Sequence, residues 1–478
     1  MRDRYCAPLI AALLIVAVVL GPGAGVATAS PPPVDDTFLP PAGAAGPLDV
    51  TDQREACSRA VADPRFGSLN APSGAGTLNF ATVWPITRGG GQLVAIIDTG
   101  VTPHPRLRDV IAGGDYVSSG DGLHDCDAHG TFVAGIIAAQ PSTADGFTGV
   151  APDARILAIR QSSLKFSRGT RDAGEYQSEN SYGSIRTLAM AVRRAADLGA
   201  TVINISEVGC ASTAAGFDDR ALGAALRYAV EVKDAVVVAA AGNVGATGPC
   251  REQNPPPDPL GSGQPDWDSV RTVATPAWYS TYVLTVGSVD PDGAPSDFSL
   301  GGPWVDVAAP GTGIVSLDAH PGSDGLVNAI VQSGDGGESM GIAGTSYAAP
   351  YVSGTAALVR ARFPHLNARE VMDRLTATAH PPAHGWDPYV GHGVIDPVAA
   401  VTADLDPSGT SGSRGFAVAP ARVSGPPGRE PAVMTTPEAP PASDPLPATI
   451  AGTLGLGSLV VTTVFLLGRF PRVRRQYR

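Results

Sequence analysis

Charged residues are scarce in this sequence, and basic residues are the scarcer kind. Only 16% of the 478 residues are Asp, Glu, Lys or Arg, and 33 basic against 45 acidic residues leave a formal net charge of −12. Nucleic-acid binding needs clustered Lys and Arg to neutralise phosphates. The few basic clusters lie at the two chain ends. The composition therefore excludes a nucleic-acid partner.

The amino terminus carries the pattern of a secretory signal. Arg2 and Arg4 come first, residues 9–20 form an apolar run, and Ala27-Thr28-Ala29 provides a small-residue cleavage site. We therefore expect residues 1–29 to be removed. An uncleaved anchor is the alternative, but the apolar run is short for a membrane span, and both interpretations imply export.

A second apolar segment lies near the carboxyl end. Residues 448–467 contain no charged side chain, and about 20 apolar residues are enough for a helix to cross a bilayer. A Pro-rich linker at residues 402–447 precedes the predicted membrane helix at 448–468, and an Arg-rich tail at 469–478 follows it. The positive-inside rule predicts a cytoplasmic tail. A buried core helix is the alternative, but the polar linker offers it no core.

Cysteine is scarce as well. The sequence has five cysteines, and Cys6 lies within the predicted signal. The other four are an even number in an exported chain, which predicts two disulfides. They are Cys57, Cys126, Cys210 and Cys250. The sequence alone leaves all three pairings open.

The remaining chain divides into an arm and a folded body. Residues 30–80 are rich in Pro, Gly and Ala without a sustained apolar period, which is typical of an extended arm. Across residues 81–401, β-branched runs alternate with Ala-rich stretches, which predicts an α/β domain with a parallel sheet. We expect strands at 93–97, 156–159, 202–205, 236–240 and 283–286, helices at 129–139, 185–198, 221–232 and 346–362, and long loops at 161–182, 247–275 and 318–341.

Three segments of the body carry residue types suited to acyl transfer. Asp98 follows the strand at 93–97, at the carboxyl edge where open α/β sheets build their sites. His129 and Ser346 open helices, whose amino termini favour developing negative charge. A serine hydroxyl needs an imidazole to accept its proton. A carboxylate then holds the imidazole in one tautomer and stabilises the imidazolium.

A fourth segment, AAAGNVG at residues 239–245, follows a predicted strand. Its Asn243 could donate the side-chain amide to an oxyanion, together with the backbone N–H of Ser346. Each residue alone has an ordinary structural explanation, as a turn aspartate, a structural histidine or a helix-cap serine. Their occurrence together in the order Asp, His, Ser favours a catalytic triad.

The blocks DTGV, HGTFVAGIIA, AGN and GTSYAAP resemble the signature blocks of the subtilase superfamily over roughly residues 80–400. This resemblance implies a subtilisin-like, doubly wound, mostly parallel α/β sheet flanked by helices. It implies Asp98 as the charge-stabilising carboxylate, His129 as the general base, Ser346 as the nucleophile and Asn243 as the oxyanion amide. It also implies a substrate-binding wall formed by Ser206, Glu207, Val208 and Gly209, with Gly242.

The order of signal, arm, subtilase body, linker, membrane helix and Arg-rich tail resembles the mycosins, membrane-anchored subtilases of type VII secretion systems. That resemblance implies disulfides Cys57–Cys126 and Cys210–Cys250, the first tying the arm down three residues before His129. It also implies association with a type VII membrane complex. An inhibitory prodomain that is later cut away is the alternative for the arm, but about 50 residues without a periodic core make a poor folded unit.

We therefore predict a membrane-anchored, extracytoplasmic serine endopeptidase that acts on a polypeptide substrate. One alternative is a mainly structural or gating subunit of a secretion complex with secondary proteolysis, and a remoter one is an exported esterase. Because Glu207 and Val208 depart from the Ser-Leu-Gly common in subtilases, the pocket preference stays open. No cofactor and no obligatory metal are predicted, since Asp121, Asp125 and Asp127 fit a solvated loop as well as a calcium site.

Overall fold

The computed structural model describes residues 29–69, 74–168, 182–213, 217–245, 250–256, 265–331 and 337–405. The predicted signal up to residue 28, the linker beyond residue 405, the membrane helix at 448–468 and the basic tail at 469–478 lie outside these residues. Within the described ranges, no helix is both long and apolar enough to cross a membrane.

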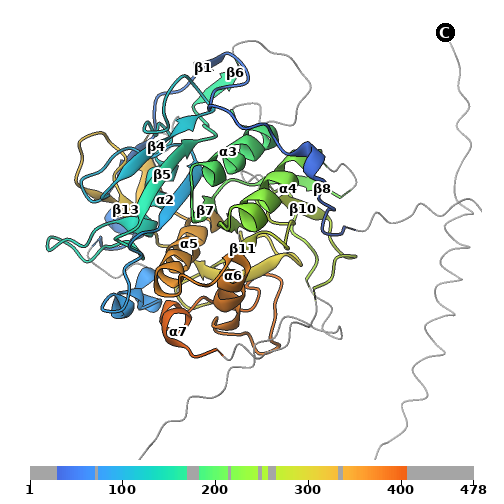
Figure 1. The fold of residues 1–478 in the computed structure, drawn as a ribbon. Helices are drawn as coiled ribbons and strands as arrows, with labels where there is room; N and C mark the ends of the chain where they lie inside the picture. The colour runs from blue at the N-terminus through green and yellow to red at the C-terminus, as the bar shows by residue number, and fades with distance from the viewer. Residues whose placement is uncertain are drawn as a thin grey trace, which may run out of the picture. The chain divides into compact units, whose positions relative to one another are not determined.

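The body is built on a seven-stranded parallel sheet (Figure 1) with the strand order β12-β11-β9-β7-β3-β5-β4. All five predicted strands are present, with ends that differ by at most three residues from those predicted. They are β3 (Leu93–Asp98), β5 (Arg155–Arg160), β7 (Val202–Ile205), β9 (Val236–Ala240) and β11 (Leu284–Val289). Every residue of β3 is buried, so both faces of the sheet are covered there. This double burial is why the inner strands are unbroken apolar runs.

The two edge strands, β4 (Val110–Asp115) and β12 (Val305–Pro310), are not among the predicted ones. β4 contains a pair of glycines and is only partly buried, and β12 ends in Ala-Ala-Pro. Both pair with a single parallel neighbour, β4 with β5 and β12 with β11. Because an edge strand needs no continuous apolar run, its sequence gives a weaker signal.

Helices pack against the sheet in two groups. The predicted helices are present as α2 (His129–Ala138), α3 (Ile185–Asp197), α4 (Arg220–Arg227) with the π-helical turn η5 (Tyr228–Val232), and α5 (Thr345–Arg362). α3 lies beside α4 (Figure 1), and α2 contacts α5. The unpredicted helices α6 (Ala368–Ala377) and α7 (Pro397–Thr402) also contact α5. α5 is buried from Thr345 to Val359, and its Ala, Gly and Ser residues allow this close packing.

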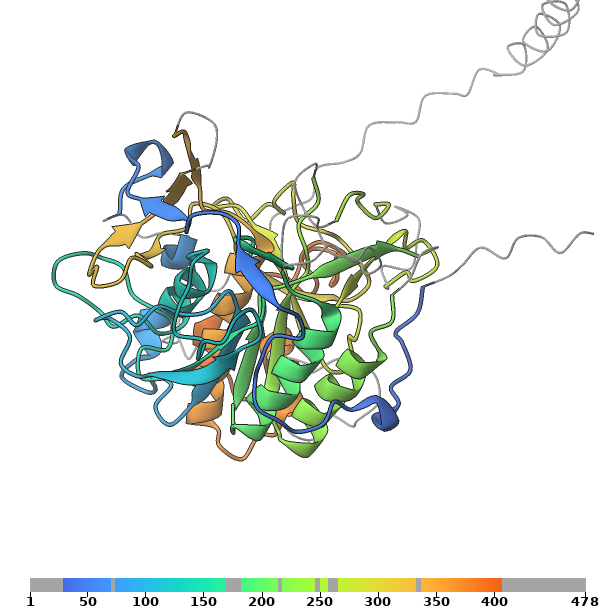
Figure 2. The same cartoon turned by 90° about the horizontal axis from the view of Figure 1, so that it is seen from above.

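The amino-terminal arm runs along the body as a mostly extended chain (Figure 2). Its regular parts are the 3-10 turns η1 (Asp36–Phe38) and η2 (Pro64–Phe66) and the strands β1 (Thr51–Gln53) and β2 (Arg59–Val61). Beside α4, Arg227 Nη1 lies 2.7 Å from the Asp36 carboxylate. Beside α3, Arg194 Nη1 donates to the carbonyl oxygen of Gly43 at 3.0 Å. Two further 3-10 turns, η3 (Gly74–Thr77) and η4 (Phe80–Val83), lead into the body.

Two segments predicted as loops supply strands that pair with the arm. β6 (Phe166–Arg168) is antiparallel to β1, and β15 (Ala329–Val331) lies antiparallel to both β2 and β16 (Ser339–Gly341). The loop predictions at 161–182 and 318–341 are therefore wrong in these parts, and the one at 247–275 is wrong for its last four residues, which form β10 (Thr272–Thr275). Strands this short are too brief to show an alternating pattern and form only by pairing with a distant segment. Two more pairs are β8 (Gly209–Ser212) with β10 (Thr272–Thr275), and β13 (Ser316–Leu317) with β14 (Leu326–Val327).

Candidate active site

The residues predicted as a catalytic triad come together at the carboxyl edge of the sheet. Asp98 ends β3, His129 begins α2 and Ser346 is the second residue of α5. His129 Nδ1 lies 2.7 Å from Asp98 Oδ1, and His129 Nε2 lies 2.9 Å from Ser346 Oγ. One imidazole therefore connects a buried carboxylate with a serine hydroxyl, which is the geometry that proton transfer from the serine requires.

The surroundings of His129 raise its pKa. Burial by itself lowers the pKa of an imidazole, but the charge and hydrogen bond of Asp98, together with the charge of Glu207, outweigh burial and raise the pKa of His129 to about 9. Asp98 Oδ1 also accepts a hydrogen bond from the backbone N–H of Thr99 at 2.7 Å. The carboxylate is thus held where it stabilises a protonated imidazole.

Tyr347 is a part of the site that sequence reasoning missed. Its ring centroid lies 4.8 Å from that of His129, and Tyr347 is buried. The ring also contacts Phe132, one turn into α2. Packing on this side restricts how the imidazole can rotate. The only signal in the sequence is that Tyr347 directly follows Ser346 in the GTSYAAP block.

The backbone of Ser346 is held by a side chain rather than by its own helix. Pro350 has no N–H, so the carbonyl oxygen of Ser346 cannot receive the usual helical hydrogen bond from four residues later. Ser206 Oγ donates to this oxygen instead, at 2.8 Å. Ser206 in turn accepts from Asn204 Nδ2 at 2.9 Å, and Asn204 Oδ1 accepts from Ser353 at 2.8 Å. A buried polar chain therefore connects β7 with the start of α5.

Asn243 is oriented with its amide nitrogen toward the serine. Its Oδ1 accepts hydrogen bonds from Thr345 N and Thr345 Oγ1, both at 2.9 Å, and these two bonds assign which end of the amide is oxygen. A β-carbon placed on Gly344 would lie 3.2 Å from Asn243 Nδ2 and 3.1 Å from Ser346 Oγ. The donor and the hydroxyl thus border the same small space, which suits stabilisation of an oxyanion.

The predicted substrate-binding residues occupy different positions around this edge. Ser206 is committed to the backbone of Ser346, as described above. Gly242 has a φ of +111°, and a β-carbon there would lie 2.9 Å from Cys250 Sγ and 3.4 Å from Val208 Cγ1. Only glycine fits this close approach. Gly209 begins β8, which pairs with β10, so the segment from Val208 onward is held beside the Cys210–Cys250 disulfide.

Glu207 lies on the His129 side of the site. Its carboxylate accepts a hydrogen bond from Ser162 Oγ at 2.7 Å. One oxygen of Glu207, one oxygen of Asp98 and one ring nitrogen of His129 all lie within 4.8 Å of one another. Burial and then the nearby charge of Asp98 raise the pKa of the Glu207 carboxyl to about 7. The sequence prediction placed Glu207 in a pocket wall without anticipating this proximity to the catalytic pair.

Asp125 shapes the turn that leads into α2. Its Oδ2 accepts from Thr131 N at 2.8 Å and from Thr131 Oγ1 at 2.7 Å, and its Oδ1 accepts from Ala128 N at 2.8 Å. Ala128, with a φ of +69°, provides no side-chain cap, so Asp125 caps the helix from three residues further back. Burial raises the pKa of Asp125 to about 6.

A solvated loop is one of two interpretations that the sequence leaves open for the acidic segment, and these contacts contradict it for Asp125 and Asp127. Asp125 and Asp127 are both buried. Asp127 accepts hydrogen bonds from Ser163 Oγ and from the backbone N–H of Leu164. Only Asp121 is exposed. The donors to Asp127 lie 36 and 37 residues away in the sequence, and those to Asp125 are presented by the turn and first residues of α2, so the acidic pattern by itself does not reveal either set.

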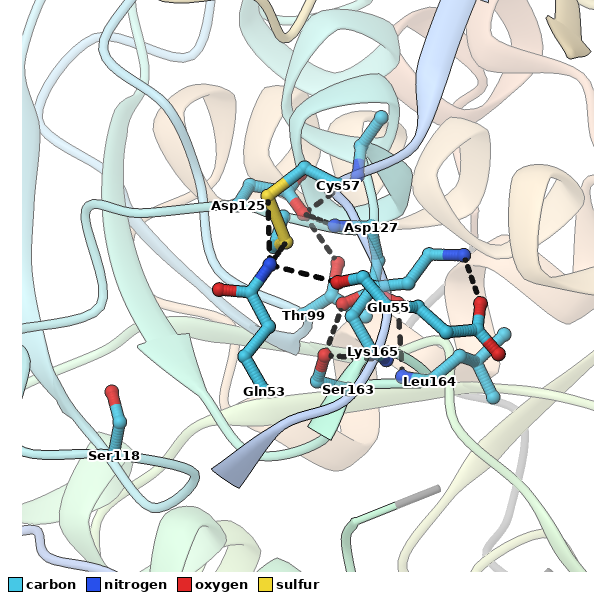
Figure 3. The surroundings of a disulfide bond; sticks show 12 residues. Gln53, Glu55, Cys57, Thr99, Ser118, Asp125, Asp127, Ser163, Leu164 and Lys165 are labelled. Carbon is cyan, nitrogen blue, oxygen red and sulfur yellow. Dashed lines mark hydrogen bonds and ion pairs between the residues drawn. A yellow bond between two sulfur atoms is a disulfide. The ribbon is translucent and has the colours of Figure 1, made fainter. Parts of the chain in front are cut away.

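Two disulfides are present, with the pairing that the family resemblance implied. They join Cys57 to Cys126 and Cys210 to Cys250. Around the first bond (Figure 3), Gln53 Nε2 donates to Cys126 Sγ at 3.4 Å. The backbone N–H of Ser58 donates to the carbonyl oxygen of Cys126 at 2.8 Å. The arm is therefore bonded directly to the turn that contains Asp125 and precedes His129.

Comparison with known proteins gives the class of this protein first. Residues 89–395 match the subtilase family, as the parallel sheet and the Asp98–His129–Ser346 geometry lead one to expect. The chain belongs to the subtilase family and is a subtilisin-like serine protease. The predicted subtilisin-like α/β fold is confirmed for the seven-stranded sheet and its flanking helices.

The relatives define the group within that family. The chain is 52% identical over 409 residues to Mycosin-4 of Mycobacterium tuberculosis, covering 84% of this chain and 86% of that protein. It is 45% identical to the solved structure of MycP1, a serine protease and essential component of the type VII (ESX-1) secretion system, with a TM-score of 0.72 and coverage of 78% and 99%. A chain of the periplasmic assembly from the ESX-5 inner membrane complex is 44% identical, with a TM-score of 0.73 and coverage of 86% and 100%. Within the subtilases, this chain is a mycosin.

Proposed function

We propose that this mycosin hydrolyses peptide bonds through Asp98, His129 and Ser346. The observation that carries the proposal is the imidazole of His129, which lies within hydrogen-bond distance of both the Asp98 carboxylate and the Ser346 hydroxyl. The oriented amide of Asn243 adds a donor for the negative charge that develops on the substrate oxygen.

The proposed reaction proceeds through an acyl-enzyme. Ser346 Oγ attacks the substrate carbonyl carbon while His129 Nε2 accepts the hydroxyl proton. Asn243 Nδ2 and the backbone N–H of Ser346 stabilise the oxyanion. The C–N bond then breaks, and His129 returns the proton to the leaving amine. A water molecule hydrolyses the Ser346 ester by the same steps, with His129 again as the base.

Labelling with a serine-directed fluorophosphonate tests this proposal. The full chain, solubilised in detergent, should be labelled on Ser346, and both Ser346→Ala and His129→Ala should abolish the signal. Ser142→Ala is the matched control, because Ser142 lies in the segment after α2 and its hydroxyl only accepts from the backbone N–H of Ala144. Labelling that persists in Ser346→Ala would contradict the assignment of the nucleophile.

We further propose an order of segments along the chain that anchors the catalytic domain to the membrane. A signal at 1–29, a retained arm at 30–80, a catalytic domain at 81–401, a linker at 402–447, a membrane helix at 448–468 and a cytoplasmic tail at 469–478 would place the active site outside the cytoplasm. The contacts of the arm with the body support its retention. Amino-terminal sequencing of the purified protein tests this, since a chain that starts beyond residue 80 would show that the arm is removed.

We also propose that the protein works within a type VII secretion complex. The support comes from its likeness to a chain of the ESX-5 periplasmic assembly. A tagged full chain should co-purify in detergent with membrane proteins of a secretion complex. A chain that is recovered alone, even after chemical crosslinking, contradicts the proposal.

A mainly structural role is the second candidate, and the same likeness to an assembled relative favours it. A deletion strain that is complemented with Ser346→Ala distinguishes the two functions. Secretion restored to the wild-type level would assign a structural or gating role. Secretion that stays lost, with the variant present at normal abundance, would assign the essential role to proteolysis.

A further inference from the structure

One carboxylate beside the proposed triad takes no part in it. Glu207 follows β7 by two residues, and β7 is the neighbour of β3, which ends in Asp98. Parallel strands end at the same edge of a sheet, so both acidic side chains emerge together. An oxygen of Glu207 lies within 4.8 Å of both an Asp98 oxygen and a His129 ring nitrogen.

The carboxylate of Glu207 is held in place through only one of its two oxygens. Ser162, just after β5 on the other side of β3, donates its hydroxyl to Oε1 of Glu207 at 2.7 Å. Within the described part of the chain, the other oxygen accepts no hydrogen bond, and the residue is only partly buried. No Lys or Arg of the described residues forms an ion pair with Glu207. One acceptor oxygen next to the reacting groups therefore has no donor within the described residues.

The charges around Glu207 favour the binding of a cationic group from another molecule. Asp98, Asp127 and His129 are the charged groups that act on it, and the two carboxylates make its ionisation harder whereas His129 makes it easier. A partly buried carboxylate without a cationic partner is costly to ionise. A guanidinium or ammonium group that donates to the open oxygen would offset that cost and form a charge-assisted hydrogen bond.

We propose that Glu207 selects an Arg or Lys side chain from a substrate residue within one or two positions of the scissile bond. The scissile carbonyl must meet Ser346 Oγ, and successive Cα atoms are about 3.8 Å apart. The long side chain of Arg or Lys from such a residue therefore reaches the carboxylate. Glu207 is then a specificity-determining residue, and Ser162 is the positioning residue that fixes the carboxylate through its other oxygen. This inference rests on the proposed proteolytic function.

Paired peptide substrates test the selection directly. Internally quenched peptides would carry either Arg or its neutral isostere citrulline at each of the two positions on either side of the scissile bond. With the full chain in detergent, kcat/KM should favour Arg by about tenfold at one position. Glu207→Gln should reduce that ratio to about one while keeping an acceptor for Ser162.

Two comparisons isolate the charge of Glu207. Glu231→Gln removes the same charge from η5, before the start of β9 and so at the opposite edge of the sheet, and should leave the ratio unchanged. In the wild type, the preference for Arg should fall as the pH drops below the raised pKa of Glu207, about 7, because the protonated carboxyl loses its charge. Ser162→Ala should lower the ratio by a smaller factor, which provides a second variant if Glu207→Gln folds poorly.

The outcomes are distinguishable. Absence of Ser346-dependent fluorophosphonate labelling in the wild type overturns the proposed function and this inference with it. Normal labelling with an Arg-to-citrulline ratio near one at every position overturns the inference alone. The same holds if Glu207→Gln moves only the pH profile and leaves the ratio intact, because Glu207 would then act on His129 and not on the substrate.

Discussion

At the scale of single residues, His129 decides how the proposed chemistry responds to pH. Burial opposes the charged imidazole, but Asp98 and Glu207 raise the pKa of His129 to about 9. A raised pKa favours the protonated imidazole at neutral pH, and a protonated imidazole cannot accept the proton of Ser346. Activity should then require alkaline conditions or the binding of a substrate that shifts this equilibrium.

The pH dependence of fluorophosphonate labelling checks this. The rate on Ser346 should rise with pH through the pKa of His129 and fall by about tenfold per pH unit well below it. Glu207→Gln removes one of the charges that raise this pKa, so its profile should shift toward lower pH, whereas Glu231→Gln should not shift it. A rate that is already constant from about pH 7 upward would contradict the raised pKa.

The amide of Asn243 gives a second prediction at this scale. Asn243→Ala removes the donor aimed at the oxyanion, and kcat should fall by about 10²- to 10³-fold with little change in KM, the size of effect known from the oxyanion amide of subtilisin itself. Because Asn243 Oδ1 also accepts from Thr345, the melting temperature must be measured beside kcat. A loss confined to KM would show that Asn243 serves substrate binding instead.

At the scale of elements, the start of α5 depends on a residue of another strand. Pro350 leaves the carbonyl oxygen of Ser346 without a helical donor, and Ser206 supplies the missing hydrogen bond. Ser206→Ala leaves that buried carbonyl unsatisfied, which should lower the free energy of unfolding by about 1–3 kcal/mol and slow labelling of Ser346. Urea unfolding and labelling rates measure the two effects. Unchanged values in both would show that water replaces the hydroxyl without cost.

The turn before α2 leads to a similar prediction. Asp125→Asn keeps the size of the side chain but replaces one acceptor oxygen by a donor, which faces the donors of Thr131 or Ala128. The unfolding free energy should drop by about 1–3 kcal/mol, and labelling should slow because His129 begins the helix that Asp125 caps. Asp121→Asn, at an exposed position of the same segment, is the control and should behave as wild type.

At the scale of the whole molecule, the arm and the body form one covalently closed unit. The arm pairs with β6 through β1 and with β15 through β2, and it is bonded to the turn before His129 through Cys57. The two elements that it pairs with belong to long insertions of the body. Part of each insertion therefore serves to hold the arm.

Removing the Cys57–Cys126 bond tests how far the arm depends on it. The bond joins positions 69 residues apart, and loss of such a loop closure costs on the order of 4 kcal/mol in the chain-entropy description. The Cys57→Ser/Cys126→Ser variant should unfold at lower urea, and limited proteolysis should cut its arm before its body. The Cys210→Ser/Cys250→Ser variant keeps the arm bonded and is the control. Equal rates of arm cleavage in both variants would show that strand pairing alone holds the arm.

Features that arise from local sequence patterns were predictable, whereas features that arise from contacts between distant segments were not. The inner strands were predictable because a parallel strand buried on both faces must be a continuous apolar run, as in β3 and β9. Asp98, His129, Ser346 and Asn243 were predictable because each lies in a short block with a recognisable order. β2 and β15 were not predictable, since each has only three residues and they pair with one another although about 270 residues separate them in the sequence.

The sequence by itself determined the class of this protein and the four polar residues of its proposed chemistry, because local patterns of burial and short motifs encode both. Only the tertiary structure decided that Asp125 is a helix cap, that Ser206 replaces a bond lost to Pro350, and that Glu207 presents an open carboxylate beside His129. Ser206 and Glu207 depend on partners far away in the chain, Ser346 and Ser162, and Asp125 depends on the way the turn before α2 folds back onto Thr131. The physical reason is that hydrogen bonds and charges act over distances in space, which the order of residues along the chain does not record.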